Sequence, residues 1–251
     1  MTVSERSVDG DTDTPDGPVP RLGLILLATD LTTERDVARL IPPEVAAVHA
    51  TRVAYANPTT PENLREMAPL LSAASALLVP GEDLVAICYS CTAASVVIGE
   101  EAVAAALDLG RPGVPVITPI GAAMTALRAL GARRISVLTP YLEEATEAVV
   151  GYLGADGFDV VCAACLGLSD DRDMARVPRA AIVEAALQVD TPDAEALFIS
   201  CTALPALAAV AEIEEALGKP VVTSNQASIR EMRRHAGLGA PVTGYGRLFS
   251  L

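Results

Sequence analysis

The chain has little that could stack on a nucleic-acid base or neutralise a phosphate backbone. Its 251 residues contain no Trp and only 3% aromatic side chains, and the formal net charge is −14. Nucleic-acid-binding domains usually carry a basic stripe or aromatic platforms, so these features disfavour a nucleic-acid partner. No apolar run approaches the length of a membrane span, and the N-terminus lacks the basic-then-apolar order of a secretory signal. A small molecule is the expected partner, with no role for a membrane.

Metal and nucleotide motifs are missing as well. The only histidines, His49 and His235, stand in no metal-binding pattern, and neither Gly-x-Gly-x-x-Gly nor a Walker-type Gly-Lys-Ser/Thr occurs. Five cysteines, an odd number in a chain of this length, are typical of reduced thiols in a cytosol. The sequence therefore predicts a cytoplasmic protein with neither a metal site nor a nucleotide cofactor.

Hydrophobic side chains make up 51% of the chain, enough for a large core. Residues 1–20 hold few of them and are rich in Asp, Gly, Pro, Ser and Thr, so they predict a flexible acidic tail. From residue 21 onward short apolar runs alternate with helical patterns, which is typical of a parallel sheet covered by helices. Strands are expected in two series: 22–27, 46–55, 84–89 and 114–117, then 135–138, 159–164, 196–199 and 220–222.

The two series repeat the same landmarks at nearly constant separation. Cys91 and Cys201 are 110 residues apart, Asp30 and Tyr141 are 111 apart, and a Gly-x-Pro-Val-[Ile/Val]-Thr phrase recurs after 105 residues. Three landmarks in the same order indicate a duplicated α/β unit.

We therefore expect an α/β protein of two pseudo-symmetric lobes, each a four-stranded mainly parallel sheet flanked by helices. The first lobe is predicted to comprise residues 21–122 plus 226–251, and the second residues 123–225. Ligands of parallel sheets bind outside the carboxyl ends of the strands, so the active site is expected in the cleft between the lobes.

Each unit contains an apolar strand that ends in Ser-Cys-Thr and leads into an alanine-rich helical pattern. The cysteines are Cys91 and Cys201, and both are predicted at helix N-termini, where the pKa of a thiol is lowered. Thr92 and Thr202 are predicted to cap these helices, and the loop amides beside each cysteine, at Ala93 and Ala203 among others, to form a cradle for a carboxylate. Ordinary capping would explain the threonines but not the repeated cysteines.

A different interpretation pairs Cys88 with Cys91 and Cys162 with Cys165, as a four-cysteine zinc site or a redox dithiol. Residues i and i+3 of a strand point to opposite faces, and this interpretation leaves Cys201 without a role. Cys88, Cys162 and Cys165 are more simply predicted to be core thiols on strands.

Four segments together resemble the aspartate/glutamate racemase superfamily. They are the two Ser-Cys-Thr turns, the stretch 26–34 (Leu-Leu-Ala-Thr-Asp-Leu-Thr-Thr-Glu), Thr139-Pro140-Tyr141, and the ending 244–248 (Gly-Tyr-Gly-Arg-Leu). Within the superfamily the chain looks most like the branch of maleate cis-trans isomerase, arylmalonate decarboxylase and the ectoine-utilisation protein A, and closest to the last. The resemblance covers residue 21 to the end.

This resemblance implies a cofactor-independent enzyme with one cleft between two lobes. Racemases of the superfamily use two cysteines as base and acid, the isomerase branch uses the first cysteine as a nucleophile on an alkene, and the decarboxylase branch keeps only the second. Both cysteines are present here, which disfavours decarboxylation. The position of Asp30 is usually Asn in the isomerase and decarboxylase. An ionised Asp accepts but cannot donate, so Asp30 favours a substrate with an amino or amidine group, unless it merely caps the next helix. Tyr141 could donate to a substrate carboxylate.

The sequence thus predicts a racemase or isomerase that acts at the α-carbon of a small amino acid or related carboxylic acid. Cys91 and Cys201 are the expected catalytic residues, and Asp30, Thr92, Ala93, Tyr141, Thr202 and Ala203 the expected substrate-binding residues. One alternative is a maleate-type cis-trans isomerase with a covalent adduct on Cys91. A second alternative is a non-catalytic binder of small carboxylates. The assembly state is left open, with a homodimer as one option.

Overall fold

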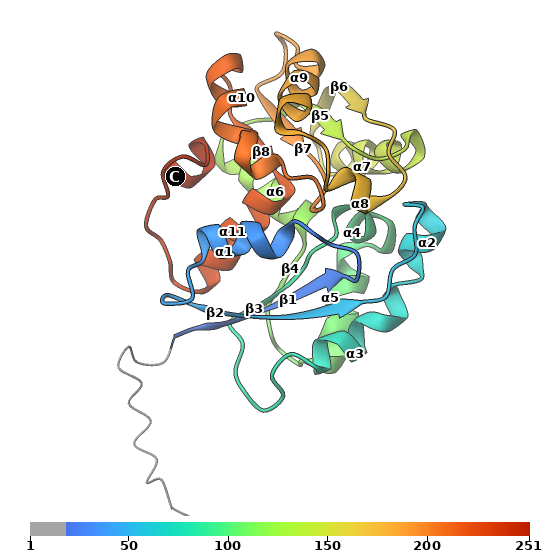
Figure 1. Cartoon of the computed structure of the whole chain (residues 1–251), viewed down its shortest axis with the longest axis vertical. Helices are drawn as coiled ribbons and strands as arrows, with labels where there is room; N and C mark the ends of the chain where they lie inside the picture. Colours follow the sequence, from blue (N-terminus) through green and yellow to red (C-terminus); the bar gives the residue numbers. More distant parts are fainter. Residues whose placement is uncertain (1–18) are drawn as a thin grey trace, which may run out of the picture.

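Two four-stranded sheets, one in each lobe, organise the molecule (Figure 1). The computed structural model describes residues 19–251, so the tail predicted for residues 1–20 lies almost wholly outside the described residues. The strands of the first sheet are β1 (Arg21–Leu27), β2 (Ala47–Val53), β3 (Ala86–Tyr89) and β4 (Val116–Ile117). Those of the second are β5 (Arg134–Thr139), β6 (Asp159–Cys165), β7 (Ala196–Ile199) and β8 (Val221–Thr223).

The two sheets have the same topology. Their strand orders are β2-β1-β3-β4 and β6-β5-β7-β8, and every neighbouring pair is parallel. Each of these eight strands begins and ends within two residues of its predicted bounds. Strand β1 is central and buried along nearly its whole length, because neighbours and helices cover it, whereas β2 and β6 are edge strands with half-exposed side chains. The predicted two-lobed α/β fold is confirmed.

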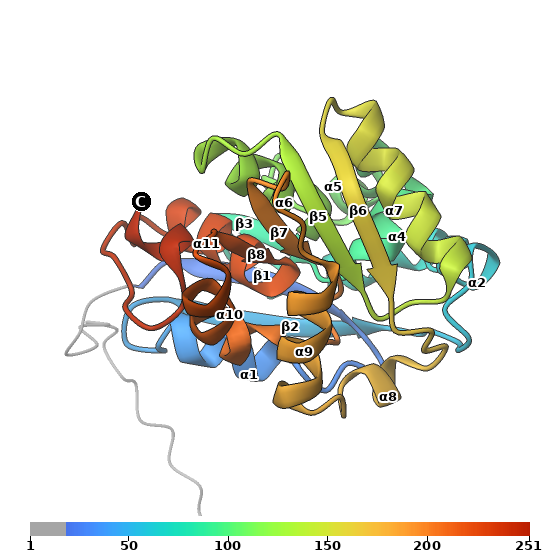
Figure 2. The same cartoon turned by 90° about the horizontal axis from the view of Figure 1, so that it is seen from above.

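Helices cover both sheets (Figure 2). After the strands of the first series come α1 (Thr33–Leu40), α2 (Pro61–Arg65), η1 (Ala68–Leu70), α3 (Leu71–Ala76), α4 (Thr92–Ile98), α5 (Glu100–Gly110) and α6 (Pro119–Ala129). The second series has α7 (Glu143–Ala155), α8 (Asp171–Met174), α9 (Arg179–Val189), η2 (Ala206–Ala209), α10 (Val210–Leu217), α11 (Ser224–His235) and η3 (Arg247–Ser250). Helix α11 packs against helices α6 and α1, against β8 of the second sheet, and against β3 and β4 of the first sheet. The lobe boundaries stay a prediction.

Two equivalent threonines cap the N-termini of the helices that lie between the sheets. Thr118 precedes α6 and accepts from the amide of Gly121, and Thr223 precedes α11 and accepts from the amide of Gln226. Because a side-chain oxygen at this position satisfies an otherwise unpaired helix amide, each threonine fixes where its helix starts. The residue that follows differs: α6 starts with Pro119 and α11 with Ser224.

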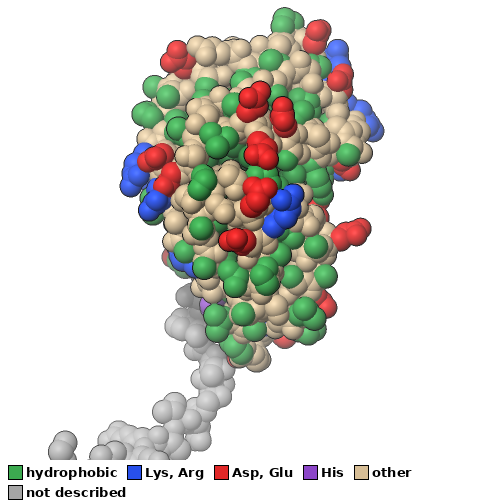
Figure 3. Space-filling view, turned by 90° about the vertical axis from the view of Figure 1, so that its right-hand side faces the viewer, with side chains coloured by type: hydrophobic (Ala, Val, Ile, Leu, Met, Phe, Trp, Pro, Cys, Tyr) green, Lys and Arg blue, Asp and Glu red, His purple; other side chains and the backbone are tan. Residues whose placement is uncertain are grey.

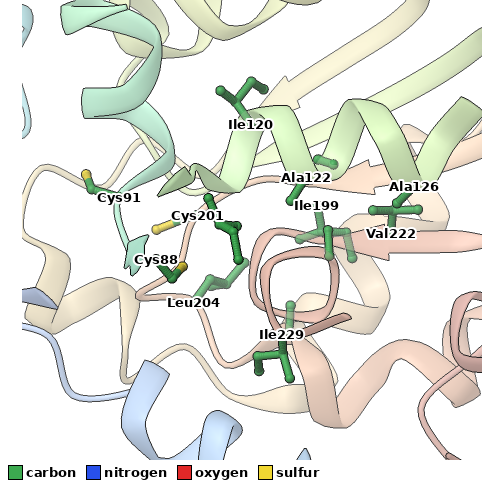
Figure 4. Close-up of a cluster of buried hydrophobic side chains, with 14 of the residues drawn as sticks. Cys88, Cys91, Ile120, Ala122, Ala126, Ile199, Cys201, Leu204, Val222 and Ile229 are labelled. Atoms are coloured by element: carbon green, nitrogen blue, oxygen red, sulfur yellow. The ribbon is translucent and has the colours of Figure 1, made fainter. Parts of the chain in front are cut away.

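The core is continuous through both lobes. The close-up draws Ile120, Ala122 and Ala126 of α6 with Ile199 of β7 and Ile229 of α11, which all belong to one buried cluster (Figure 4). All five side chains are at most 5% exposed. The two lobes therefore share one apolar interior, which holds their strand ends in a fixed relation.

The surface reflects the acidic composition. Acidic side chains run down the middle of one face, with scattered basic ones among and beside them (Figure 3). Within residues 19–251, no helix combines the length and apolarity that a bilayer span requires. The predicted cytoplasmic location stays a prediction.

Candidate active site

The two repeated cysteines lie on one cavity. Cys91 directly follows Ser90 at the end of β3, and Cys201 follows Ser200 at the end of β7. Their side chains are 6% and 7% exposed, and both line the same cavity between the lobes. Figure 4 shows the two thiols reaching this region from the start of α4 and from the loop after β7. The fold thus brings together two thiols that are 110 residues apart in the sequence.

The backbone around the two cysteines differs from the prediction in each half. Cys91 is itself the N-cap of α4, with an extended backbone, so Thr92 is the first helical residue and not the cap. Cys201 has a positive φ of 100°, and no α-helix follows until Val210, after the short helix η2. A left-handed backbone leads the chain away from a helical start, so Thr202 caps no helix. The predicted pair of equivalent helix starts is wrong for Cys201.

The two threonines instead connect the lobes. The hydroxyl of Thr92 donates to Ser224 Oγ at 2.8 Å, and the hydroxyl of Thr202 donates to the carbonyl of Ser90 at 3.1 Å. Both threonines are almost fully buried. Each cysteine loop is therefore held by a hydrogen bond to the other sheet's side of the cavity.

The cavity is small and mostly closed. A water-sized sphere can move its centre through about 20 Å³ of it, close to the room that a single water needs. Predicted site residues that line it are Cys91, Thr92, Ala93, Tyr141, Cys201, Thr202 and Ala203. The sequence reasoning missed the other lining residues, which are Leu27, Tyr55, Thr59, Leu64, Asp171 and Met174. None of the described lining residues is basic.

Asp171 is the ionisable group among the missed residues that matters most. It is 4% exposed and begins α8, after β6. Thr29 donates its hydroxyl to Asp171 Oδ2, and the side-chain amide of Asn57 donates to Asp171 Oδ1 at 2.8 Å. Both oxygens of this buried side chain therefore accept hydrogen bonds from neighbouring residues. The acidic run 169–173 after a parallel strand could have indicated it, since ligands bind at such strand ends.

Asp30 lies close by but does not line the cavity. Its Oδ1 accepts from the amides of Thr32 and Thr33 at 2.9 Å each, and its Oδ2 accepts from the Thr33 hydroxyl at 2.7 Å. Burial raises the pKa of Asp30, and these hydrogen bonds oppose the rise. Both oxygens are engaged in fixing the start of α1, as the capping alternative expects. A contact between Asp30 and a substrate stays a prediction.

Tyr141 lines the cavity on the side of Cys201. It is 2% exposed, and its hydroxyl lies 3.3 Å from Ser200 Oγ. Burial raises the pKa of Tyr141 well above its ordinary value, so it remains a neutral donor. Burial raises the pKa of Cys201, and a hydrogen bond from the Tyr141 hydroxyl partly opposes this rise. Tyr141 thus faces the Cys201 thiol, whereas Asp30, its counterpart in the first half, accepts hydrogen bonds from Thr32 and Thr33 at the start of α1.

Both thiols have raised pKa values, contrary to the expectation from helix N-termini. Burial is the main cause and raises the pKa of Cys91 and of Cys201 to about 12. The amide of Ala94 opposes this at Cys91, and the amides of Leu204 and Ala203 oppose it at Cys201. Desolvation outweighs these hydrogen bonds, so the thiols are neutral while the cavity is closed. Three of the amides predicted as a carboxylate cradle, those of Ala94, Ala203 and Leu204, are thus directed at the sulfurs.

The four-cysteine interpretation fails on position. Cys88 lies on β3 of the first sheet, whereas Cys162 and Cys165 lie on β6, the edge strand of the second. Within residues 19–251, no three His, Cys, Asp or Glu side chains gather as metal ligands would. Cys88 is a core thiol as predicted, but Cys165 is exposed and Cys162 half-buried, because an edge strand is covered less completely.

The sequence and the fold of this chain are similar to those of proteins with known activities. Residues 72–249 match the family described as arylmalonate decarboxylase. The chain belongs to this family. A maleate isomerase of Nocardia farcinica is 30% identical over 92% of this chain and 95% of its own length. An arylmalonate decarboxylase of Bordetella bronchiseptica is 36% identical over 55% of this chain and 58% of its own length.

Solved structures of the family agree in fold. A cysteine-to-serine mutant of the Nocardia farcinica maleate cis-trans isomerase, with a covalently bound succinylcysteine intermediate, superposes with a TM-score of 0.85. It is 28% identical, and the match covers 92% of this chain and 98% of that one. The predicted branch of the superfamily is confirmed, and cysteine-based catalysis without a cofactor is the chemistry that its members support. The particular closeness to the ectoine-utilisation protein stays a prediction.

Proposed function

We propose that the chain is a cofactor-independent isomerase that inverts the α-carbon of a small amino acid or a related carboxylic acid, with Cys91 and Cys201 as base and acid. The observation that carries the proposal is that two buried thiols, one from each lobe, line one small cavity. Inversion requires a base on one face of the carbon and an acid on the other, and two thiols on one cavity meet this need.

The proton transfers balance without any co-reactant. One thiol first releases its proton to solvent. The resulting thiolate takes the α-proton and becomes a thiol again, and the electron pair left on carbon spreads into the carboxylate. The opposing thiol gives its proton to the other face and becomes a thiolate. The raised pKa of both sulfurs makes each a stronger base toward a weakly acidic C–H bond. The Tyr141 hydroxyl and the nearby amides stabilise the thiolate when it forms.

The charge of the cavity favours a substrate with an amino group. Asp171 supplies a carboxylate, and no basic side chain among the described lining residues offsets it. A dicarboxylate would meet like charge there, whereas the ammonium group of an amino acid would meet its opposite. We therefore assign to Asp171 the role that the sequence suggested for Asp30.

The test is exchange of the α-proton with solvent. The wild-type protein is incubated in D₂O with each enantiomer of a panel of small amino acids, and loss of the α-proton signal is followed by NMR. We expect exchange and racemisation of at least one amino acid, and loss of racemisation in Cys91→Ser and in Cys201→Ser.

Cys165→Ser is the matched control, because Cys165 is exposed and lies outside the cavity. Racemisation that survives in both cavity variants would contradict the two-thiol mechanism. Saturable thermal stabilisation by amino acids without any exchange would instead favour the non-catalytic binder.

A second candidate is cis-trans isomerisation through an adduct on Cys91. Its specific support is the relative with a covalently bound succinylcysteine, which matches 92% of this chain. Addition of a thiolate to an unsaturated dicarboxylate, followed by rotation and elimination, would return the cysteine unchanged. Intact-mass spectrometry of Cys201→Ser with maleate separates the two routes, since a mass gain mapped to Cys91 is expected only for this candidate.

A further inference from the structure

Ser224 lies where the two cysteine loops meet. It is the first residue of α11, it is 0% exposed, and β8 directly precedes it. Its Oγ accepts from the hydroxyl of Thr92 at 2.8 Å and from the backbone N–H of Cys201 at 3.1 Å. A single buried hydroxyl thus contacts the residue after one cysteine and the backbone of the other.

The two cysteines depend on this contact unequally. The N–H of Cys91 donates to the carbonyl of Tyr89 at 3.0 Å, within its own strand end, and Cys91 has an extended backbone. Cys201 has a positive φ of 100°, a conformation that costs energy for any residue with a side chain, and its N–H is donated to Ser224. An unusual backbone of this kind persists only where surrounding contacts hold it. Ser224 supplies such a contact.

The duplication gives the first half no equivalent hydroxyl. Thr118 and Thr223 are equivalent caps, but the next residue is Pro119 before α6 and Ser224 before α11. Ser224 therefore breaks the pseudo-symmetry at the point where the lobes meet. Its neighbour Asn225 supports the same loop by donating to the carbonyl of Thr202 at 3.0 Å.

We infer that Ser224 is a positioning residue that fixes the Cys201 thiol relative to the Cys91 thiol. The inference rests on the proposed two-thiol function. Ser224 itself touches no reacting atom; it sets the backbone conformation of Cys201 and ties that backbone to Thr92. Removal of the hydroxyl releases both loops together and misplaces one thiol across the cavity.

The test compares Ser224→Ala with Ser224→Thr, which keeps the oxygen, and with Ser228→Ala as a matched control. Ser228 lies one turn further along α11 and is also buried. Its hydroxyl donates to the carbonyl of Ser224 and contacts the core thiol Cys88, but it makes no hydrogen bond to Thr92 or to the backbone of Cys201. We expect Ser224→Ala to lower kcat for racemisation by about 10- to 100-fold with KM little changed, because misplacement by about 1 Å has an effect of this size. Ser228→Ala is expected to keep the wild-type kcat, and Ser224→Thr to recover part of the loss.

A second readout needs no substrate. Alkylation of each cysteine by iodoacetamide is followed by peptide mass spectrometry from pH 7 to 11. In Ser224→Ala the alkylation rate of Cys201 across this pH range is expected to change, because the amides and hydroxyl that favour its thiolate depend on the loop, while the profile of Cys88 stays in place. A shifted Cys201 profile in a protein that racemises nothing would leave the positioning role standing and refute the proposed function. Wild-type kcat and an unchanged Cys201 profile in Ser224→Ala would overturn the inference.

Discussion

Three buried thiols predict that the protein loses stability as the pH rises from 8 to 10. Cys88, Cys91 and Cys201 are each at most 7% exposed, and burial raises the pKa of each from 9.0 to about 12. In the unfolded chain these thiols titrate near the ordinary value, while in the folded protein they stay protonated. The folded state then binds more protons than the unfolded state, so the free energy of unfolding falls with pH above about 9 and is fully retained below it.

The expected loss follows from the size of the shift. Between pH 8 and pH 10 each thiol lowers the free energy of unfolding by roughly 1 to 2 kcal/mol, and the three together lower it by about 4 kcal/mol. That is a large part of the stability of a typical domain, which is about 5–15 kcal/mol. Burial also raises the pKa of Tyr55, Tyr89 and Tyr141, which would add to the loss above pH 10, so the comparison stops there.

Urea denaturation of the reduced protein at pH 8, 9 and 10 measures this loss. Cys88→Ala removes one of the three thiols, so the fall in the free energy of unfolding from pH 8 to pH 10 should be about one third smaller than in the wild type. This comparison holds even if the substitution also changes the stability at pH 8. The exposed Cys165 provides the control, because Cys165→Ala should leave the loss as in the wild type. If the wild-type free energy of unfolding is unchanged between pH 8 and 10, the assignment of three buried neutral thiols is wrong.

Three further predictions concern single side chains. Asp171→Asn is expected to speed the alkylation of both cavity cysteines at a given pH, because the charge of Asp171 adds to burial in raising their pKa. It should also weaken the preference for amino acids over uncharged acids. Unchanged alkylation rates would contradict the place of Asp171 beside the thiols. Thr118→Ala and Thr223→Ala should each lower the free energy of unfolding by about 1 kcal/mol, as measured by urea denaturation, since each removes a helix cap. Only Thr223→Ala should also lower activity, because Thr223 directly precedes Ser224. Gly246→Ala should destabilise the protein by well over the ~1 kcal/mol that alanine costs at a positive φ, because the added Cβ would lie 2.4 Å from a Val210 methyl. Gly244→Ala is the control, since Gly244 also has a positive φ but has open space around it. Equal losses of melting temperature in the two variants would refute the prediction.

The sequence by itself determined the fold and the two thiols. Strand positions follow from local apolar runs, and the duplication follows from landmarks that recur at nearly constant spacing, so neither requires knowledge of distant contacts. Because both Ser-Cys-Thr phrases end parallel strands, their place at the cleft was also predictable.

Only the tertiary structure decided what surrounds the thiols. Asp171, at the start of α8, and Tyr55, after β2, line the cavity from segments outside the repeated Ser-Cys-Thr phrases. The carboxylate of Asp30 is turned to the start of its own helix. The raised pKa of the thiols depends on how completely both lobes cover them, and the backbone of Cys201 depends on a hydroxyl 23 residues further on, which also binds Thr92 from 132 residues away. Desolvation and long-range hydrogen bonds arise only when the lobes meet, and no local pattern in the chain records them.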